Sequence, residues 1–138
     1  MENDLILASG SRIRADLLRS AALNISVESP RLDEDSLKAA LLAEDASAHD
    51  IADALAEAKA RKVANRFPQA RVLAADQTLS FEHRMLSKPA TREEAREHLM
   101  MLRGKTHMLL SAAVLYENAE PVWRHVGVAR LTMRTLSP

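Results

Sequence analysis

Short apolar runs alternate with amphipathic stretches along the chain, and this alternation predicts an α/β fold. Residues 5–8 form an apolar run that stops at small polar residues, which is typical of a buried strand. Behind it, Ile13, Leu17 and Leu18 recur at helical spacing, and Ser11 is available to cap that helix. A strand, a small-residue turn and a helix together form the opening unit of an α/β domain.

Three further helices are expected from their boundary residues. A short helix is predicted over 36–44, and a longer helix begins with Asp50 as its N-cap. Thr91 and Glu94 form a capping box that opens another helix. Gly104 stands where a glycine in the left-handed conformation ends that helix.

The remaining apolar segments predict strands. Residues 72–75 read as a buried strand that residues 76–78 close with a turn. The other strands are expected at 25–27, 108–116, 122–128 and 130–136. A sheet that ends on a strand leaves an edge for a partner to cover.

Composition narrows the class of protein. A chain of 138 residues is expected to form one domain, and it has no cysteine, which excludes disulfides, thiolate zinc sites and cysteine nucleophiles. The charges balance at 19 basic and 19 acidic residues, and aromatic residues are few, so neither a nucleic acid nor a membrane is expected as a partner. No apolar run reaches the ~20 residues of a membrane span, and residues 1–4 do not resemble a signal peptide. A cytoplasmic location is expected.

Two positions at strand ends are candidates for chemistry. The segment 9–14 joins a strand to a helix, where free backbone N–H groups, hydroxyls and arginines can bind an anion. The alternative is that Ser11 only caps the helix and the arginines face water. Asp76 follows an apolar strand, where ligands of open α/β sheets bind, and it can act as a base or a metal ligand. The alternative is an aspartate that begins a turn.

Lysines and an acidic cluster are further candidates. Lys59 lies close to the apolar face of its helix, so it either extends outward to water or reaches into a cleft. Lys88 precedes a proline in a loop. The acidic cluster 33–35 suits Mg²⁺ but also suits the start of a helix. Histidine spacing shows no zinc motif.

Six motifs in matching order resemble the Maf family of nucleotide pyrophosphatases over nearly the whole chain. The segment 8–18 is similar to the family's Ala-Ser-x-Ser-Pro-Arg-Arg-x-x-Leu-Leu, and 33–34 stands at its Asp-Glu pair. The segment 55–60 matches Leu-Ala-x-x-Lys-Ala, and 75–76 matches the start of Ala-Asp-Thr. The last two motifs are 87–89, similar to Gly-Lys-Pro, and 102–107, similar to Leu-x-Gly-x-x-His.

The resemblance implies an elongated, two-lobed α/β domain around a central mixed sheet, with the cleft between the lobes. It implies an enzyme that hydrolyses a nucleoside triphosphate to the monophosphate and pyrophosphate, by attack of water at the α-phosphate, with Mg²⁺ or Mn²⁺. By this resemblance Asp76 is catalytic, Glu34 and Asp76 hold the metal, and Gln77 affects substrate specificity. The residues expected to bind the substrate phosphates are Ser9, Ser11, Arg12, Arg14, Lys59 and Lys88.

Three positions depart from the family pattern and indicate a divergent branch with its own base preference. Ile13 replaces an arginine, Gln77 replaces a threonine, and Ser87 replaces a glycine. The expected substrates are pyrimidine or modified nucleotides removed before polymerases use them. The alternative is a nucleotide-binding protein that regulates septum formation or cell division without turnover.

The extent of the chain adds two expectations. Residues 1–138 are expected to form a single Maf-like domain that lacks the C-terminal part of the family fold, which closes the cleft there. Dimerisation is common in the family, and a final strand with a free edge is suited to pairing. A homodimer is therefore expected.

Overall fold

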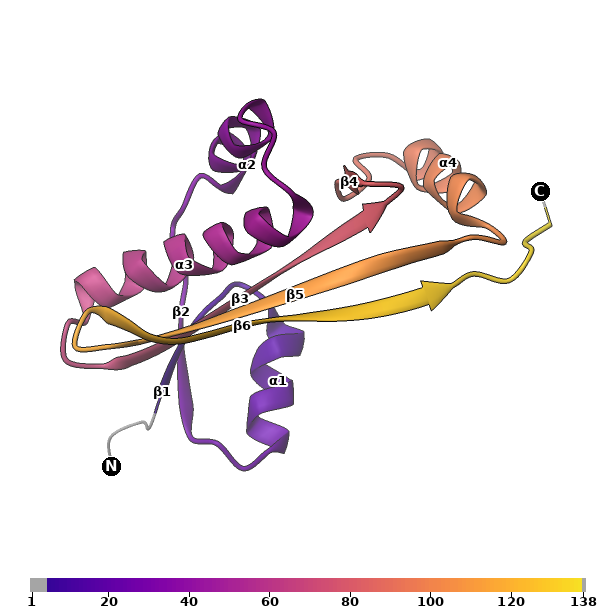
Figure 1. Cartoon of the computed structure of the whole chain (residues 1–138). Coiled ribbons are helices and arrows are strands. Elements are labelled where there is room, and N and C mark those ends of the chain that lie inside the picture. The colour runs from indigo at the N-terminus through magenta and orange to yellow at the C-terminus, as the bar shows by residue number, and fades with distance from the viewer. Residues whose placement is uncertain (1–4, 138) are drawn as a thin grey trace.

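The computed structural model describes residues 5–137, which form one mixed sheet with helices on both faces (Figure 1). The strands are β1 (Leu5–Ala8), β2 (Ile25–Glu28), β3 (Arg71–Phe81), β4 (Arg84–Leu86), β5 (Thr106–Glu117) and β6 (Glu120–Thr132). The helices are α1 (Arg12–Ser20), α2 (Glu34–Ala43), α3 (Ala48–Arg66) and α4 (Arg92–Leu102). The strand order is β2-β1-β3-β5-β6, and β4 pairs with β3. Strand β1 is parallel to β2 and β3, whereas β3, β5 and β6 are antiparallel neighbours.

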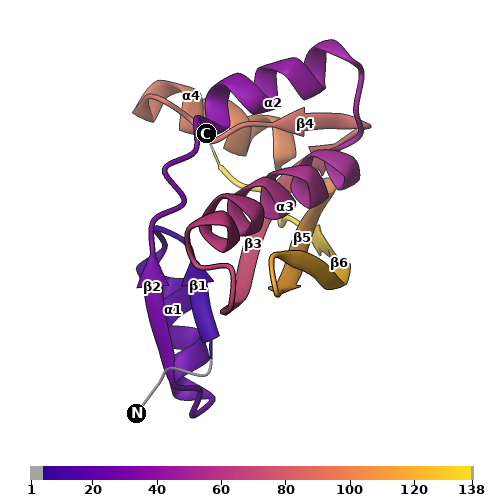
Figure 2. The same ribbon diagram turned by 90° about the vertical axis from the view of Figure 1, so that its left-hand side faces the viewer.

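Side chains of β1 alternate between two cores, one on each face of the sheet. Leu7 packs with Ala15 of α1 and Ile25 of β2 on one face. Ala8 points to the opposite face and belongs to the core beneath α3. Figures 1 and 2 show α1 and α3 on opposite sides of the strands. This alternation produces the layered α/β arrangement that the apolar pattern predicts.

Helix α3 presents a row of small side chains to the sheet. Fully buried alanines recur every four residues and so lie on one face of the helix, at Ala52, Ala56, Ala60 and Ala64. This row packs against Val72 and Ala74 of β3 and against Val114 and Tyr116 of β5. Small side chains allow the helix backbone to approach the sheet closely, so α3 is firmly held over the strands that carry the site.

Strands β3, β5 and β6 are long enough to join two lobes. The N-terminal lobe contains β1, β2, α1, α2 and α3, and the distal lobe contains β4, α4 and the far ends of the long strands (Figure 1). In the N-terminal lobe, Arg124 of β6 donates hydrogen bonds to Asp53 and Glu57 of α3, with an Nη1–Oδ2 distance of 2.8 Å to Asp53. These bonds raise the pKa of Arg124 and fix α3 across the sheet. The expected two-lobed domain around a mixed sheet is confirmed.

Strand pairing corrects the expected end of β3. The predicted strand stopped before a turn at 76–78, but β3 continues to Phe81. Residues Arg71 to Ser80 pair continuously with β5, and Asp76 lies opposite Ala112 within this ladder. Asp76 is therefore held in the middle of a strand and does not begin a turn. The expected separate strand at 130–136 is also wrong, because β6 itself extends to Thr132.

Helix boundaries follow most of the predicted signals, with one cap misplaced. Ser11 and Thr91 cap α1 and α4, as expected. Gly104 follows α4 with a φ of +67°, in the left-handed region where glycine is favoured. The N-cap of α3 is Ser47 and not Asp50, because the Ser47 hydroxyl accepts the backbone N–H of Asp50.

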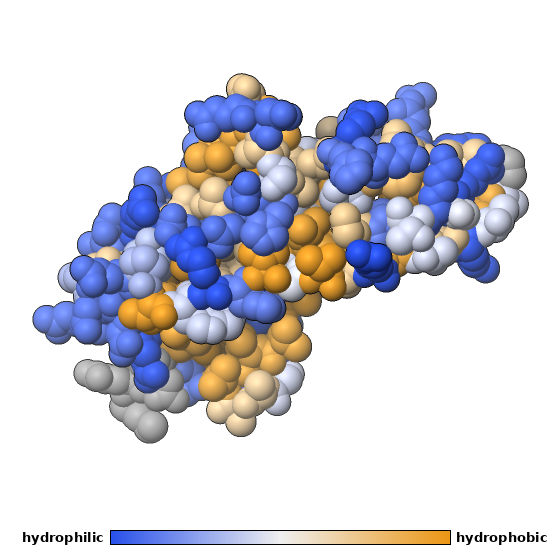
Figure 3. All heavy atoms as spheres, viewed as in Figure 1, coloured by the Kyte–Doolittle hydropathy of each residue, from blue (hydrophilic) through white to orange (hydrophobic). Residues whose placement is uncertain are grey.

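The apolar face of α1 differs from the predicted one. Ile13 is 81% exposed and Leu17 is 69% exposed, whereas Ala15 is buried against the sheet. Leu18, which belongs to the predicted face, also packs against this core. The contact between α1 and the sheet is narrow because β1 and β2, the strands beneath the helix, have only four residues each. Figure 3 shows the apolar surface that results below the sheet, where α1 lies in Figure 1.

Two isoleucine-to-alanine variants test this division between core and surface. Ile51→Ala removes a fully buried side chain at the start of α3, and we expect a loss of about 2–5 kcal/mol in the free energy of unfolding. Ile13→Ala is the matched control and should change it by no more than about 0.5 kcal/mol, because the side chain is largely exposed. Urea denaturation measures both changes. Equal losses of unfolding free energy in the two variants would contradict the exposed position of Ile13 on α1.

The cap of α2 gives a second test. Ser36 donates two hydrogen bonds to the Asp33 carboxylate, from its hydroxyl at 2.7 Å and its backbone N–H at 3.1 Å. These bonds lower the pKa of Asp33. Ser36→Ala should therefore raise that pKa toward its ordinary value, while Asp35→Asn should leave it lowered. NMR titration of the Asp33 carboxyl carbon measures the shift, and an unchanged value in Ser36→Ala would contradict this cap.

A lowered folded-state pKa has a defined effect on stability. The folded protein holds the ionised Asp33 more favourably than the unfolded chain does, so this cap stabilises the fold above the unfolded-state pKa. That contribution disappears as pH falls through the lowered pKa of the folded state. The Ser36→Ala variant should consequently lose less stability than the parent between neutral and strongly acidic pH.

Candidate active site

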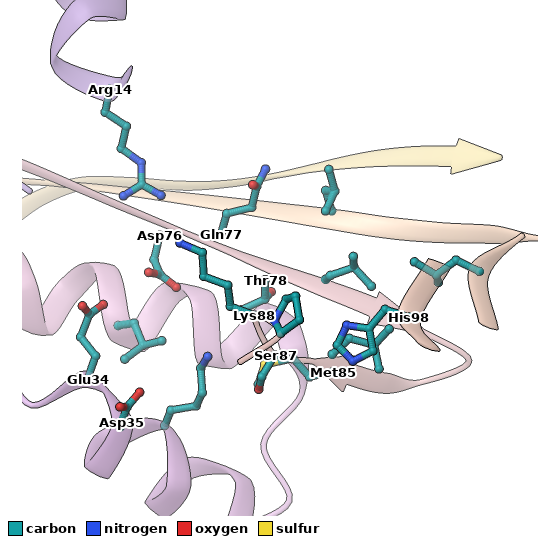
Figure 4. Close-up of a pocket in the computed structure, with 17 residues that line it drawn as sticks. Arg14, Glu34, Asp35, Asp76, Gln77, Thr78, Met85, Ser87, Lys88 and His98 are labelled. Atoms are coloured by element: carbon teal, nitrogen blue, oxygen red, sulfur yellow. The ribbon is translucent and has the colours of Figure 1, made fainter. Parts of the chain in front are cut away.

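A cleft of about 550 Å³ lies between the two lobes, along the edge of β3 that β1 leaves free (Figure 4). Strand β1 pairs with β3 only at Val72 and Leu73, and β4 pairs with the last residues of β3 from Leu79 onward, so residues 74–78 of β3 have an open edge. Asp76 is the first of four consecutive β3 residues that line the cleft. The rest of its walls is formed by the four helices, by strands β4 and β5 and by the loop at 87–89. The topology therefore places an aspartate of a central strand at the cleft between the lobes.

A buried lysine joins two acidic residues at this point. The Nζ atom of Lys59 lies 2.8 Å from Oδ1 of Asp76 and 2.7 Å from Oε1 of Glu34. The side chain of Lys59 is only 8% exposed, compared with 13% for Asp76 and 46% for Glu34. A buried ammonium needs such partners, because desolvation of an unpaired charge is costly. Of the two orientations that the sequence left open for Lys59, the structure shows the one that reaches inward.

The acidic cluster 33–35 separates into three different environments. Asp33 caps α2 through its bonds to Ser36 and is exposed. Glu34, the first residue of α2, contacts Lys59, and Asp35 lines the cleft. The three residues are consecutive in the sequence, so the sequence alone could not show which of them caps the helix and which faces the cleft. The helix-start interpretation holds for Asp33, and Glu34 joins Asp76 at the ammonium.

The turn after β1 lies beside this ion pair. Ser9 is buried, and it lines a second cavity of about 170 Å³ together with Lys59 and Glu34. Its hydroxyl accepts the backbone N–H of Ser11 at 2.9 Å, which shapes the turn. Ser11 itself caps α1 by accepting the N–H of Arg14, and it lines neither cavity. The smaller cavity thus shares its Glu34 wall with the cleft.

The two arginines of this segment point in different directions. The side chain of Arg14 extends from α1 toward β3 and lines the cleft (Figure 4). Arg12 is exposed and lines neither of these cavities. Positions two residues apart on an α-helix differ by about 200° in direction, which explains why only one of the two arginines reaches the site.

Lys88 and Gln77 enter the cleft from the loop after β4 and from β3. Figure 4 shows Lys88 extended toward Asp76 across the cleft. Gln77 lines the cleft beside Asp76, and its Nε2 atom donates a hydrogen bond to the Ser111 hydroxyl of β5 at 3.0 Å. That bond fixes the orientation of the Gln77 amide. Both residues therefore line the same cleft as Asp76.

Several lining residues were not singled out from the sequence. Lys38 lies one helical turn after Glu34 on α2, and Arg31 lines the smaller cavity. His98 and Leu102 line the cleft from α4, where their i, i+4 spacing was the available signal. Thr78 is buried and donates to the backbone carbonyl of Ala48, which ties β3 to the start of α3.

Glu34 and Asp76 provide oxygen ligands suitable for a divalent cation. Each carboxylate uses one oxygen for Lys59, which leaves Oε2 of Glu34 and Oδ2 of Asp76 for other partners. Within residues 5–137, no group of three or more His, Asp or Glu side chains could hold a metal by itself. Mg²⁺ commonly takes one or two carboxylates and completes its shell with water and substrate phosphates. The donor set fits that mode of binding.

The charges around the cleft suit the binding of a polyanion. Cationic side chains enter from α1, α2 and the loop after β4, at Arg14, Lys38 and Lys88. Asp76 is available to orient a water molecule next to these cations. The site therefore combines cationic side chains with a carboxylate.

Among the described residues, no helix has the length and apolar character needed to cross a membrane.

Comparison with known proteins agrees with this arrangement. The family model for Maf-like protein matches residues 4–138. A protein of Ruegeria pomeroyi named nucleoside triphosphate pyrophosphatase is 60% identical over 133 residues, which cover 96% of this chain and 67% of that protein. A 7-methyl-GTP pyrophosphatase of Mesorhizobium japonicum is 47% identical over 138 residues, which cover 100% of this chain and 69% of that protein. The chain thus spans about two thirds of the length of these curated relatives.

A solved structure shares the fold. The HAM1 protein from Coxiella burnetii superimposes with a TM-score of 0.62 at 18% sequence identity, covering 95% of this chain and 73% of that one. At this identity the likeness concerns the fold alone. The family model spans nearly the whole chain and two relatives share about half of its residues or more, so the chain belongs to the Maf-like protein family.

Proposed function

We propose that this chain hydrolyses a nucleoside triphosphate to the monophosphate and pyrophosphate. The observation that carries the proposal is the position of Asp76, held by the Lys59 ammonium beside Glu34 at a cleft lined with cations. The relatives named nucleoside triphosphate pyrophosphatase support the same reaction. A role in binding without turnover, in cell division or elsewhere, is not favoured by these relatives.

The triphosphate is the part of the substrate that the charged residues bind. Arg14, Lys59 and Lys88 offset its negative charge, and charge-assisted hydrogen bonds to phosphate oxygens are stronger than neutral ones. Ser9 adds a hydroxyl at the smaller cavity. Ser11 serves this role indirectly, by shaping the turn and capping α1. Arg12, which faces outward, contributes only to the surrounding positive potential.

Asp76 activates the attacking water. One of its oxygens is fixed by Lys59, and the other accepts a hydrogen bond from the water. The water oxygen forms a bond to the α-phosphorus while the bond from that phosphorus to the α–β bridging oxygen breaks. The water's proton passes to Asp76, and pyrophosphate leaves with the bonding electron pair. The cations around the leaving group stabilise the charge that develops there.

Glu34 and Asp76 are the proposed ligands of Mg²⁺ or Mn²⁺. When bound, such an ion neutralises phosphate charge and makes a coordinated water a stronger nucleophile. Lys59 keeps both carboxylates turned toward the same point and so prepares the pair for that ligand. The two carboxylates supply only part of an octahedral shell, and phosphate oxygens and water complete it.

We infer that the substrate carries a modified base and that Gln77 contributes to its selection. Two relatives, from Mesorhizobium japonicum and Rhizobium meliloti, are named 7-methyl-GTP pyrophosphatase and are 47% and 48% identical to this chain. Gln77 is adjacent to Asp76, and Ser111 fixes the direction of its amide group. Pyrimidine triphosphates are the alternative that a substrate panel separates.

The remaining expectations from the sequence stay predictions. Strand β6 is the last strand in the sheet order, so one of its edges has no partner strand among residues 5–137. This edge is compatible with the expected homodimer. A cytoplasmic location is compatible with a nucleotide substrate. The single domain expected for residues 1–138 is likewise a proposal.

Asp76→Asn tests the catalytic assignment. The amide cannot accept the water's proton, so pyrophosphate release should fall by about 10²–10⁴-fold while the circular dichroism spectrum stays unchanged. Asp16→Asn is the matched control, because this exposed aspartate of α1 does not line the cleft. The measurement is pyrophosphate release from a panel of canonical and modified triphosphates with Mg²⁺. Full activity in Asp76→Asn would exclude it as the base.

Metal removal tests the role of the carboxylate pair. With EDTA, pyrophosphate release should fall to background, and excess Mg²⁺ or Mn²⁺ should restore it. Glu34→Gln should raise the metal concentration needed for half-maximal activity, because one ligand is lost. Undiminished turnover in EDTA would overturn the proposed cofactor and leave the Asp76 assignment to be judged separately.

A further inference from the structure

The end of the cleft away from the ion pair has a different chemical character. Its walls there are mainly apolar, formed by Leu79, Met85, Leu86, Pro89, Leu102 and Leu109. These side chains come from β3, β4, the following loop, α4 and β5, so the apolar end belongs to the distal lobe. The charged end is formed by α1, α2 and the middle of β3, and Lys88 reaches it from the loop after β4. The cleft is therefore divided between charged and apolar ends.

This division matches the two ends of a nucleotide. A triphosphate is stabilised by the cations near Asp76, whereas a nucleobase is a flat and largely apolar ring with polar edges. Small-molecule sites are mostly apolar, with a few polar groups that fix orientation. A nucleotide whose α-phosphate is next to Asp76 consequently places its base toward the distal lobe.

One imidazole is present among the described residues that line the cleft. His98 belongs to α4 and lies one turn before Leu102, so both side chains share the helix face that lines the cleft. Figure 4 draws the His98 ring at the end of the cleft away from Arg14 and Glu34. The side chain is half-buried.

The polar groups of His98 are available to a ligand. Within residues 5–137, no side-chain hydrogen bond or ion pair is formed by its ring. By contrast, the nearby polar residues Gln77 and Thr78 are already bonded to Ser111 and to the Ala48 carbonyl. A neutral imidazole has one donor and one acceptor, which suits the mixed edge of a nucleobase.

We propose that His98 contacts the edge of the nucleobase and determines which bases the enzyme accepts. This inference rests on the proposed function, because it takes the ligand to be a nucleoside triphosphate. The phosphate-binding residues contact a part that all such substrates share and do not distinguish among bases. His98 is a specificity residue for the same reaction, supplied by the distal lobe, whereas Gln77 acts from the central strand.

Two substitutions at this position and one control test the proposal. His98→Ala removes both ring nitrogens, and His98→Gln replaces them with an amide that also has donor and acceptor atoms. Glu97→Ala is the control, because Glu97 is exposed on the same helix and does not line the cleft. The readouts are kcat/KM for a panel of triphosphates that differ only in the base, and inhibition by inorganic tripolyphosphate, which has no base.

The expected result is a loss confined to base recognition. In His98→Ala, kcat/KM for the preferred triphosphate should fall by about tenfold or more, because a hydrogen bond to its base is lost. The differences in kcat/KM among the triphosphates should therefore become smaller. His98→Gln should retain turnover with a changed order of preference. The inhibition constant of tripolyphosphate should be unchanged in all variants, and Glu97→Ala should match the parent.

Several outcomes would overturn the inference. An unchanged order and ratio of preferences in His98→Ala, with the parent active, would exclude a base contact and leave the proposed function intact. If His98→Ala weakened inhibition by tripolyphosphate by the same factor as it lowered kcat/KM, His98 would have a phosphate-binding or structural role instead. If the parent releases no pyrophosphate, the proposed function fails. The base contact of His98 is then tested by calorimetry, which measures the affinity of each triphosphate for the parent and for His98→Ala. In that case, equal affinities in parent and His98→Ala, or no binding at all, would overturn it.

Discussion

The site depends on one buried cation, the ammonium group of Lys59. It comes from α3, and its two partners come from the start of α2 and from the middle of β3. A buried charge must be compensated where it lies, so the pairing constrains the positions of three elements at once. Asp76 and Glu34 carry like charges, and Lys59 allows them to lie together at the cleft. The packing of α3 through its alanine row holds the cation in place.

The length of β3 and β5 turns this ion pair into a site. Because the two strands stay paired from Arg71 to Ser80 of β3, the sheet continues beyond the point where β1 ends and carries a second lobe. The open edge of β3 between the lobes becomes the floor of the cleft. Most of the charged groups therefore come from the N-terminal lobe, with Lys88 added by the loop after β4, and most of the apolar groups come from the distal lobe. This arrangement explains how one cleft can bind both ends of a nucleotide.

Local signals in the sequence predicted local structure well, and long-range pairing explains the errors. Ser11, Thr91 and Gly104 mark helix ends through bonds and backbone angles set by their immediate neighbours. The polar residues after Ala75 looked like a turn, yet pairing with β5, more than 25 residues away, keeps them in a strand. The buried direction of Lys59 was equally undetermined by helical spacing. Motif order supplied the candidate residues, and the fold was needed to show which of them meet.

The most direct test asks whether Lys59 and Asp76 work as one unit. We would measure kcat/KM for pyrophosphate release in Lys59→Met, Asp76→Asn and the double variant, after confirming that each is folded. If the ammonium acts by holding the catalytic carboxylate, the double variant should be no slower than Asp76→Asn alone, as found for residues that act together. Losses that multiply in the double variant would show independent roles and contradict a site organised by Lys59.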